Sequence, residues 1–362
     1  MPLAEAQVTM AAVKPQIESM VRKSPSAKLR DTALNPSGAV HEVLALMADG
    51  RLHSGQELAS RLRVTRAAIW KQVRQLRGQG LPVAAVAGRG YQLPWPLELL
   101  DAAHIVRALP SARRQALASL DVLWRTASTS DVLRDPSLEI TRQPRVVLAE
   151  SQSAGRGRRG RAWLSPPGLN ICLSLATRFD CGAVALAGLS LAVGVMLLRA
   201  LDDVGCNRAG LKWPNDILAD NAKLAGVLVE IDGEYSGPYR VVIGVGLNLR
   251  MPEALCRQAD QPVTDLARLM AGEPPSRNTL AAAMISRLIE GLEQFRQNGF
   301  AAFADDYCRY DLLRGKPLKI TSQQAAWFGQ GAGVDARGAL RVRTESGGLV
   351  SVDSSDVSVR RT

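Results

Sequence analysis

Cysteine and histidine are scarce in this sequence, and neither is arranged for metal binding. The five cysteines occur singly, with no CxxC pair, at Cys172, Cys181, Cys206, Cys256 and Cys308. An odd number of widely spaced cysteines fits a reducing compartment and argues against a zinc site. The three histidines are equally isolated, at His41, His53 and His104. We therefore expect structural or surface roles for them and predict no metal site formed by the chain itself.

The sequence also lacks a membrane-spanning run and an N-terminal signal-peptide pattern. Its longest apolar run, residues 183–198, carries two glycines and a serine. This run falls short of the roughly 20 residues that a membrane span needs. It is more typical of a buried helix, which we predict over Ala183–Leu201. We therefore expect a cytoplasmic protein without a membrane partner.

What the sequence has in excess is positive charge. Of its 362 residues, 45 are Lys or Arg and 34 are Asp or Glu, which gives a net charge of +11. Residues 1–95 contain 13 Lys or Arg and 6 Asp or Glu, so they carry +7 of that +11. This asymmetry favours a nucleic-acid partner for the N-terminal part, because neutralised phosphates supply much of the affinity for DNA. The hydrophobic content of 46% is ample for packed cores, and the length suits two or three domains.

The basic N-terminal part has the pattern of a winged helix-turn-helix domain over residues 37–95. Residues 1–36 are rich in Ala, Lys and Ser, and predict a disordered tail. After the tail, apolar residues at helical spacing predict a first helix, and the capping-box sequence Ser54-Gly55-Gln56-Glu57 opens a second. A third helix is predicted over Thr65–Arg77, followed by two short strands around Gly88-Arg89-Gly90.

The third predicted helix would enter the major groove of DNA. Its basic face and the tip of the wing supply the predicted DNA contacts, which are Arg66, Trp70, Lys71, Arg74, Arg77 and Arg89. The alternative is a winged helix that is used for protein contacts.

The rest of the chain predicts two further domains, which makes the protein a multidomain α+β chain. Pro94-Trp95-Pro96 is typical of a linker. Over residues 96–311 strand and helix patterns alternate, which indicates a central α/β domain. Strands are predicted at 120–125, 146–149, 170–177, 227–231 and 239–244, and helices at 279–296 and 301–308. Short strands with turn signals over residues 312–362 predict a small SH3-like β-barrel.

One stretch of the central domain, Gln152 to Arg161, combines four arginines with three glycines. Glycine lets a ligand approach the main chain, and arginine grips carboxylates and phosphates. A loop with this composition is suited to closing over a polyanion, although a solvated basic loop has the same composition. Its glycine spacing also fits a dinucleotide-binding fingerprint. That interpretation needs a helix at the third glycine, and Ser165-Pro166-Pro167-Gly168 breaks any such helix.

Four other segments carry polar groups that suit a ligand site. Lys212-Trp213-Pro214-Asn215-Asp216 offers a tryptophan to pack over a flat ligand and two polar arms. Lys223 precedes an apolar strand and could bind a carboxylate or phosphate. Gly244-Val245-Gly246-Leu247-Asn248 ends a strand with an amide that could read a base or ribose. Ser128-Thr129-Ser130 suits a neutral polar head group. Each segment alone has an ordinary structural explanation as a turn, a strand edge or a helix cap.

Together, in this order and spacing, these motifs resemble the bifunctional biotin protein ligases that also repress the biotin operon. The resemblance covers about residues 38–362. Its strongest carriers are Gly155–Arg161, Lys212–Asp216, Lys223–Gly226 and Gly244–Asn248. In the first domain Ser54-Gly55, Arg66-Ala67-Ala68-Ile69 and Gly88-Arg89-Gly90-Tyr91 also match. It implies an ATP-dependent ligase that makes biotinyl-5'-AMP from biotin and Mg-ATP. A lysine of biotin carboxyl carrier protein then takes the biotin. It also implies an adenylate-bound homodimer that binds biotin operator DNA.

The resemblance implies a role for individual residues. Biotin contacts are expected from Ser128, Thr129, Ser130, Gln152, Gly155, Arg156, Gly157, Arg158, Lys223 and Gly226. ATP contacts are expected from Arg159, Arg161, Trp163, Asn215, Asn248 and Arg360. The catalytic residues are expected to be Lys223, Arg156, Arg158 and Asp216. Lys223 would hold the carboxylate and the α-phosphate, and Asp216 would deprotonate or orient the incoming lysine. Mg²⁺ would enter with ATP.

The sequence departs from the family pattern at three places. Ser130 stands where the family usually has Asn, and Val263 stands where some members place an aromatic ring over the adenine. Ser355-Asp356 replaces a Gly-Glu pair near the C-terminus. None of these changes removes a charged residue of the central site. Two other functions remain open at this point: a ligand-sensing regulator whose catalysis has decayed, and a lipoate ligase, which shares the catalytic architecture.

Overall fold

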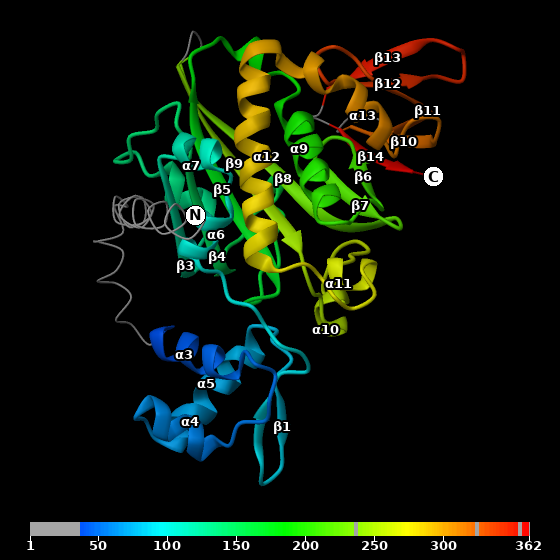
Figure 1. The fold of residues 1–362 in the computed structure, drawn as a ribbon. Coiled ribbons are helices and arrows are strands. Elements are labelled where there is room, and N and C mark those ends of the chain that lie inside the picture. Colours follow the sequence, from blue (N-terminus) through cyan, green and yellow to red (C-terminus); the bar gives the residue numbers. More distant parts are fainter. Residues whose placement is uncertain (1–36, 235–237, 323–325, 354–356, 362) are drawn as a thin grey trace, which may run out of the picture.

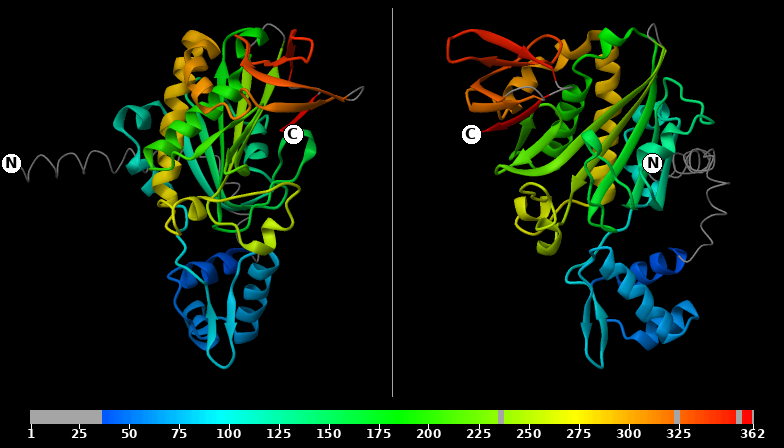
Figure 2. Two further views of the ribbon diagram at one scale, coloured as in Figure 1. Left: turned by 90° about the vertical axis from the view of Figure 1, so that its right-hand side faces the viewer. Right: turned by 180° about the vertical axis from the view of Figure 1, so that it is seen from behind.

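The computed structural model describes residues 37–234, 238–322, 326–353 and 357–361. The predicted tail over residues 1–36 and the Ser355-Asp356 pair lie outside the described residues. The described chain forms a winged helix, a central sheet covered by helices and a small β-domain, in that order (Figure 1). Figure 2 shows from two further sides that the winged helix lies at one end of the molecule and the C-terminal strands lie toward the other.

The winged helix is built as the sequence patterns predict. Its elements are α3 (Ser37–Met47), α4 (Gly55–Leu62), α5 (Arg66–Gly78), β1 (Ala84–Val86) and β2 (Gly90–Gln92). The Ser54 hydroxyl accepts a hydrogen bond of 3.0 Å from the amide of Glu57, which satisfies one of the free amides at the start of α4. Thr65 caps α5 in the same way. Buried apolar side chains from all three helices, such as Leu44, Leu58 and Ile69, form one core.

A close backbone approach fixes the wing to the start of α4. Tyr91 and His53 exchange two backbone hydrogen bonds of 2.9 Å. The neighbouring Gly90 has a φ of +141°, and a Cβ atom there would clash with the carbonyl group of His53. Only glycine fits this position, because it has no Cβ atom and tolerates positive φ.

The central sheet has seven strands in the order β3-β4-β5-β9-β8-β7-β6. They are β3 (Ser119–Thr126), β4 (Arg145–Gln152), β5 (Asn170–Phe179), β6 (Ala209–Lys212), β7 (Asp216–Ala219), β8 (Ala222–Gly233) and β9 (Tyr239–Asn248). Strands β3 and β4 are parallel, and all other neighbours are antiparallel. The five strands predicted from the sequence lie inside β3, β4, β5, β8 and β9. The patterns do not predict β6 and β7, because four-residue strands are too short to show an alternation.

Two long helices, α9 (Leu189–Asp203) and α12 (Arg277–Asn298), cover one face of this sheet (Figure 1). The predicted buried helix over Ala183–Leu201 is confirmed from Leu189 on, and the prediction is wrong for the residues before it. The chain forms a 3₁₀ turn, η3 (Ala183–Leu186), and begins α9 only after Gly188, whose φ is +77°. The stretch Ala183–Asp203 is apolar and long enough to cross a membrane, but 67% of its most apolar window is buried inside the protein. Packing in the core therefore accounts for its composition.

Shorter elements complete the central domain. They are α6 (Ala102–Ala108), α7 (Ser111–Ala116), α8 (Thr129–Arg134), η2 (Arg158–Gly160), α10 (Glu253–Cys256), α11 (Leu266–Leu269), η4 (Gly299–Phe303) and α13 (Ala304–Tyr310). The predicted helix at 279–296 lies inside α12, and the one at 301–308 is divided between η4 and α13.

The small β-domain predicted for the C-terminus is a five-stranded antiparallel sheet in the order β13-β12-β11-β10-β14. Its strands are β10 (Pro317–Thr321), β11 (Ala326–Val334), β12 (Leu340–Arg343), β13 (Leu349–Val352) and β14 (Ser358–Arg361). Trp213 ties this domain to the central one, because its indole Nε1 donates a 3.0 Å hydrogen bond to the carbonyl of Gly338. The Trp213 side chain is buried at this junction. Trp213 also belongs to the lining of the cavity described below, and its packing over a flat ligand stays a prediction.

The segment predicted as a linker packs tightly between the winged helix and the central domain. The amide of Leu97 donates a 2.7 Å hydrogen bond to the carbonyl of Ala48. Leu97 and Leu169, which precedes β5, both belong to the buried core of the winged helix. On the other side of the junction, the guanidinium of Arg250 lies 5.1 Å from the centre of the Trp95 ring. The two domains thus share one packed boundary.

Candidate active site

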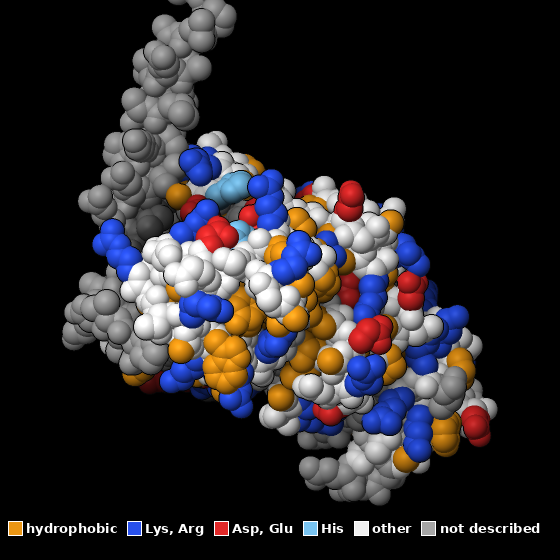
Figure 3. Space-filling view, turned by 90° about the horizontal axis from the view of Figure 1, so that it is seen from below, with side chains coloured by type: hydrophobic (Ala, Val, Ile, Leu, Met, Phe, Trp, Pro, Cys, Tyr) orange, Lys and Arg blue, Asp and Glu red, His pale blue; other side chains and the backbone are white. Residues whose placement is uncertain are grey.

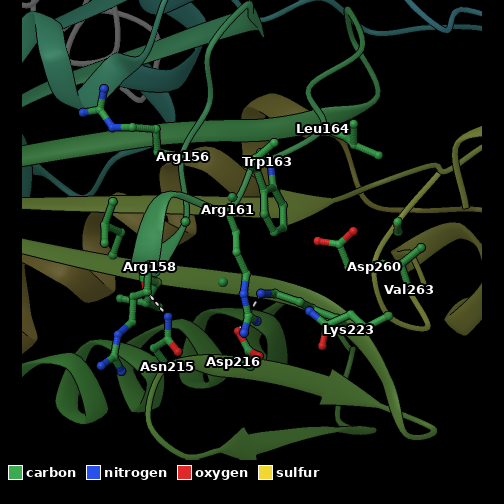
Figure 4. A pocket seen from close by; sticks show the side chains of 18 of the residues that line it. Arg156, Arg158, Arg161, Trp163, Leu164, Asn215, Asp216, Lys223, Asp260 and Val263 are labelled. Carbon is green, nitrogen blue, oxygen red and sulfur yellow. Dashed lines mark hydrogen bonds and ion pairs between the residues drawn. The ribbon is translucent and has the colours of Figure 1, made fainter. Parts of the chain in front are cut away.

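A cavity of about 1020 Å³ lies over the central sheet and collects nearly all the residues that the sequence predicts (Figure 4). It is lined by Ser128, Thr129, Ser130, Gln152, Arg156, Gly157, Arg158, Arg159, Arg161, Trp163, Asn215, Asp216, Lys223, Gly226, Asn248 and Arg360. Gly155 is the one predicted ligand residue outside this lining. It lies directly behind, where its carbonyl accepts a 2.9 Å hydrogen bond from the amide of Trp163.

Buried hydroxyl groups line one end of the cavity, which we call its floor. Ser128, Thr129 and Ser130 lie where α8 begins, and all three are buried. The side-chain oxygen of Gln152 accepts hydrogen bonds from the Thr129 amide at 2.8 Å and from the Thr129 hydroxyl at 3.1 Å. The hydroxyl of Ser174, from β5, lies 2.7 Å from that of Thr129 and 3.0 Å from that of Ser130. This end can therefore bind an uncharged polar group.

The other end of the cavity is cationic and contains an ion pair between Lys223 and Asp216. The ammonium of Lys223 lies 2.6 Å from the carboxylate of Asp216, and both side chains are mostly buried. The same ammonium lies 5.6 Å from the centre of the Trp163 ring. A Cβ atom at Gly246 would overlap this ring, so the glycine leaves the space that the indole fills. Glycine at this position thereby determines where the tryptophan and lysine side chains can lie.

The arginine loop supplies the cations above Lys223 and Asp216. Arg158 is half-buried in this loop, and burial, followed by the nearby charge of Arg159, lowers its pKa. Arg159 has a φ of +58° and donates a 3.0 Å hydrogen bond to the carbonyl of Val357, next to β14. The loop thus reaches the C-terminal sheet, which contributes Arg360 to the same cavity.

Arg156, in contrast, points away from Lys223 and Asp216 (Figure 4). Its guanidinium donates two hydrogen bonds, of 2.7 and 2.5 Å, to the carboxylate of Asp131 on α8. These bonds, opposed by burial and assisted by the arginine charge, hold the pKa of Asp131 below its ordinary value. A ligand contact by the Arg156 side chain would therefore require the loss of a two-pronged ion pair.

Two amides predicted to contact ATP are engaged within the protein. The Asn248 amide donates to the carbonyls of Lys223 and Thr264, at 3.3 and 3.0 Å, and its oxygen accepts from Asn170 at 2.9 Å. The Asn215 amide donates a 2.7 Å hydrogen bond to the carbonyl of Val227. In this structure both side chains hold neighbouring segments of the cavity wall in place.

The segment from Met251 to Val263 forms the roof over the cationic end. The Lys223 amide donates a 2.8 Å hydrogen bond to the carbonyl of Pro262, and the Lys223 carbonyl accepts one of 2.9 Å from Thr264. Val263 therefore lies beside Lys223. Asp260 points from the roof into the cavity (Figure 4).

Comparison with known proteins gives the family. Residues 42–92 match an HTH domain, residues 122–248 match the Biotin/lipoate A/B protein ligase family, and residues 315–360 match the Biotin protein ligase C terminal domain. The Bifunctional ligase/repressor BirA of Salmonella typhimurium is 36% identical over 87% of this chain and 97% of its own length. The chain belongs to the bifunctional biotin ligase/repressor family.

Other relatives agree with this membership. The Bifunctional ligase/repressor BirA of Bacillus subtilis is 28% identical over 84% of this chain and 93% of its own length. The solved structure of the biotin protein ligase from Aquifex aeolicus in complex with biotin and ATP is 25% identical, with a TM-score of 0.56. It covers 67% of this chain and 99% of the Aquifex chain.

The surface of the winged helix that this ligase/repressor would turn to DNA is basic. Arg66, Trp70, Lys71 and Arg74 are exposed on α5, and Arg89 is exposed at the wing tip. The predicted contact Arg77 is exposed as well, although its Nε donates a 2.7 Å hydrogen bond to the carbonyl of Val83. Figure 3 views the molecule from the winged-helix end, where basic side chains are spread over the surface with acidic ones between them.

Several residues that line the cavity have no predicted role, among them Ser174, Lys212, Asp260 and Arg361. Lys212 pairs with Asp216 across the β6-β7 hairpin, and its pKa is lowered mainly by burial. A prediction of that hairpin would have placed the lysine beside the aspartate. Ser174 gives no such signal, because it lies within a strand that is buried almost throughout.

Proposed function

We propose that the protein makes biotinyl-5'-AMP in this cavity and transfers the biotinyl group to a lysine of biotin carboxyl carrier protein. In the first step a carboxylate oxygen of biotin attacks the α-phosphorus of ATP, and pyrophosphate leaves. In the second step the lysine nitrogen attacks the acyl carbon, AMP leaves, and the nitrogen loses a proton. The observation that carries this proposal is the joining of a neutral hydroxyl floor to a cationic end in one cavity.

The charges of the cavity match the demands of the first step. A carboxylate and a triphosphate repel each other, so their approach needs cations that are already in place. Lys223 is held by Asp216 at the position where the two anions would meet. Arg158, Arg159, Arg161 and Arg360 would hold the phosphates, and Trp163 would cover the intermediate. Asn215 and Asn248 would contribute by fixing the wall of the ATP site.

At the neutral end, Ser128, Thr129, Ser130 and Gln152 would bind the head group of biotin. Gly155, Gly157 and Gly226 would let the ligand approach the main chain. In the second step Asp216 would accept or orient the proton of the incoming lysine. Arg156 would join the site only after it leaves Asp131.

Magnesium would enter the cavity with ATP. Among the described residues no group of three or more His, Cys, Asp or Glu could hold a metal ion. Only two carboxylates, those of Asp216 and Asp260, belong to the lining described for this cavity. This donor set fits an ion bound mainly by phosphates and water, with one or two carboxylates added. Such an ion would neutralise phosphate charge when bound.

Biotin-dependent release of pyrophosphate from ATP is the direct test. Release in the presence of biotin, followed by labelling of the carrier protein, is the expected result, and its absence would favour a sensor without catalysis. Calorimetry with biotin and with lipoate in parallel examines the remaining alternative. Tighter binding of lipoate would contradict the proposal.

We also propose that the adenylate acts as a corepressor, which favours a homodimer on biotin operator DNA in the cytoplasm. The roof of the cavity touches the winged helix, because Leu255 of α10 packs against Gly80. Directly before the roof, Arg250 lies over Trp95. A ligand that orders the roof would thus act on the DNA-binding domain. A gel-shift titration should show tighter operator binding with biotin plus ATP, and sedimentation should show the dimer. Equal operator affinity in both conditions would end the corepressor proposal.

A further inference from the structure

The hydroxyl groups at the floor of the cavity form a chain whose hydrogen-bond directions can be worked out. The chain runs from Ser130 through Ser174 and Thr129 to Gln152, with links of 3.0, 2.7 and 3.1 Å. All of its hydroxyl groups are buried, and all four residues line the cavity. Ser174 occupies the middle of the chain.

The donor and acceptor roles along this hydroxyl chain follow from one backbone hydrogen bond. The amide of Thr129 donates to the side chain of Gln152 at 2.8 Å, so the accepting atom there is the oxygen. The hydroxyl of Thr129 lies 3.1 Å from the same oxygen and must donate to it, because a carbonyl oxygen only accepts. A hydroxyl has one proton, so Thr129 accepts from Ser174, and Ser174 in turn accepts from Ser130.

Every hydroxyl proton of the chain is therefore directed toward Gln152. The hydroxyl chain therefore presents acceptor lone pairs to the cavity. Thr129 and Ser174 each have one lone pair left, and Ser130 has two. The strand opposite Ser174 leaves room for this arrangement, because a Cβ atom at its pairing partner Gly244 would lie 2.9 Å from the Ser130 hydroxyl. A floor with this polarity accepts hydrogen bonds and selects a ligand that brings N–H donors.

We propose that Ser174 determines the specificity of the biotin site by fixing the polarity of this hydroxyl chain, so that the floor accepts hydrogen bonds from the ureido N–H groups. The proposal rests on the proposed function of the cavity. A cyclic urea carries two N–H donors, whereas the dithiolane ring of lipoate carries none. Ser174 is a positioning residue for Thr129 and Ser130, and the same polarity that favours biotin excludes lipoate.

Loss of the Ser174 hydroxyl would interrupt the chain of hydrogen bonds between Ser130 and Thr129. In a Ser174→Ala variant Thr129 still donates to Gln152, but Ser130 loses its acceptor and can turn its proton into the cavity. The floor then presents a donor where the ureido N–H needs an acceptor. Buried groups left without a partner account for the strong rejection of a ligand that lacks the matching group.

The test is a cycle of ligand and protein variants measured by calorimetry without ATP. The ligands are biotin and the two lactam analogues in which one ureido N–H is replaced by CH₂. The wild type should prefer biotin over at least one lactam by about 10- to 100-fold, as expected for a lost hydrogen bond to a buried group. In Ser174→Ala this preference should fall to within about threefold, because coupled groups are not additive.

The control is Ser119→Ala, which removes a buried hydroxyl of β3 outside the cavity lining. It should retain the wild-type preference, and ATP binding should be unchanged in both variants. If thermal melts show that Ser174→Ala does not fold, Ser130→Ala is measured in its place and should weaken the preference in the same direction. An equal preference for biotin in the wild type and the folded variant would overturn the role of the chain. If the wild type binds no biotin at all, the proposed function fails instead.

Discussion

The winged helix and the cavity both present cations to an anion, but the two regions hold their cations differently. On the winged helix, Arg66, Lys71 and Arg74 are exposed on one helix. In the cavity, Lys223 is mostly buried and held at 2.6 Å by Asp216. Exposed charges lie in water and adjust to a long polyanion, whereas buried charges must be fixed in advance by a partner. The first arrangement suits affinity that depends on salt, and the second suits a reaction at one atom.

The largest effect of a substitution that distinguishes the cavity from the winged helix should come from Lys223. In a Lys223→Ala variant the carboxylate and α-phosphate lose their shared cation, and adenylate formation should fall by about 10³-fold. Pyrophosphate release measures it. Lys71→Ala is the matched control, since it removes a lysine from the DNA-facing surface and should leave turnover intact. Near-normal turnover of Lys223→Ala would remove this lysine from the site.

The next effect should come from the glycine behind the tryptophan. A methyl group at Gly246 would overlap the Trp163 ring, so Gly246→Ala should displace the ring from Lys223. Misplacement on this scale costs about 10²-fold in rate. Single-turnover adenylate formation measures the loss, and Gly182→Ala, where a Cβ atom meets nothing within 4 Å, should be neutral. Equal rates in the two variants would show that the indole does not have to lie there.

A smaller effect is expected at the DNA-facing end. Arg66→Ala and Arg74→Ala should each reduce the slope of log affinity against log salt by about 0.9, which is the contribution of one neutralised phosphate. Fluorescence anisotropy over a range of salt concentrations measures the slope, and pyrophosphate release should not change. An unchanged slope in both variants would direct attention to another face of the domain, including the alternative of protein contacts.

The smallest effect concerns the pair between Asp131 and Arg156. Since Arg156 lowers the pKa of Asp131, the pair contributes its full stabilisation above the ordinary pKa of 3.8. This contribution is lost as the pH falls from there through the lowered pKa of the folded state. Asp131→Asn should therefore cost at most about 1 kcal/mol at neutral pH, because both side chains are partly exposed. Denaturant unfolding at pH 7 and near pH 3 should show a smaller difference from wild type in acid. A difference of the same size at both pH values would assign the effect to another cause.

The winged helix could be predicted almost element by element, because each of its helices has an apolar stripe in the local sequence, and α4 and α5 also carry a cap. The central sheet was predicted only where its strands are long. The pairing order could not be deduced, since it depends on contacts between segments as distant as β5 and β9. The split at Gly188 was missed because the glycine lies inside an uninterrupted apolar run.

The cavity shows a similar limit. Motifs with charge and glycine, such as the arginine loop and Lys223, could be recognised from the sequence. The partners of these residues could not. The ion pair between Asp131 and Arg156 and the internal hydrogen bonds of Asn248 leave no sequence signal, because they join residues 16 or more positions apart. Trp213 shows the same limit, since nothing in the sequence indicates that its indole donates a hydrogen bond to the C-terminal domain.

The packed boundary at Leu97 and Leu169 has a consequence for how such a protein could measure DNA. Because the winged helix packs directly on the central domain, a symmetric dimer of these chains would hold its two α5 helices at one separation and one mutual orientation. Five extra base pairs between the half-sites, about half a turn of the duplex, would turn one half-site to the far side. The stiffness of the joint would thereby act as a ruler for operator spacing.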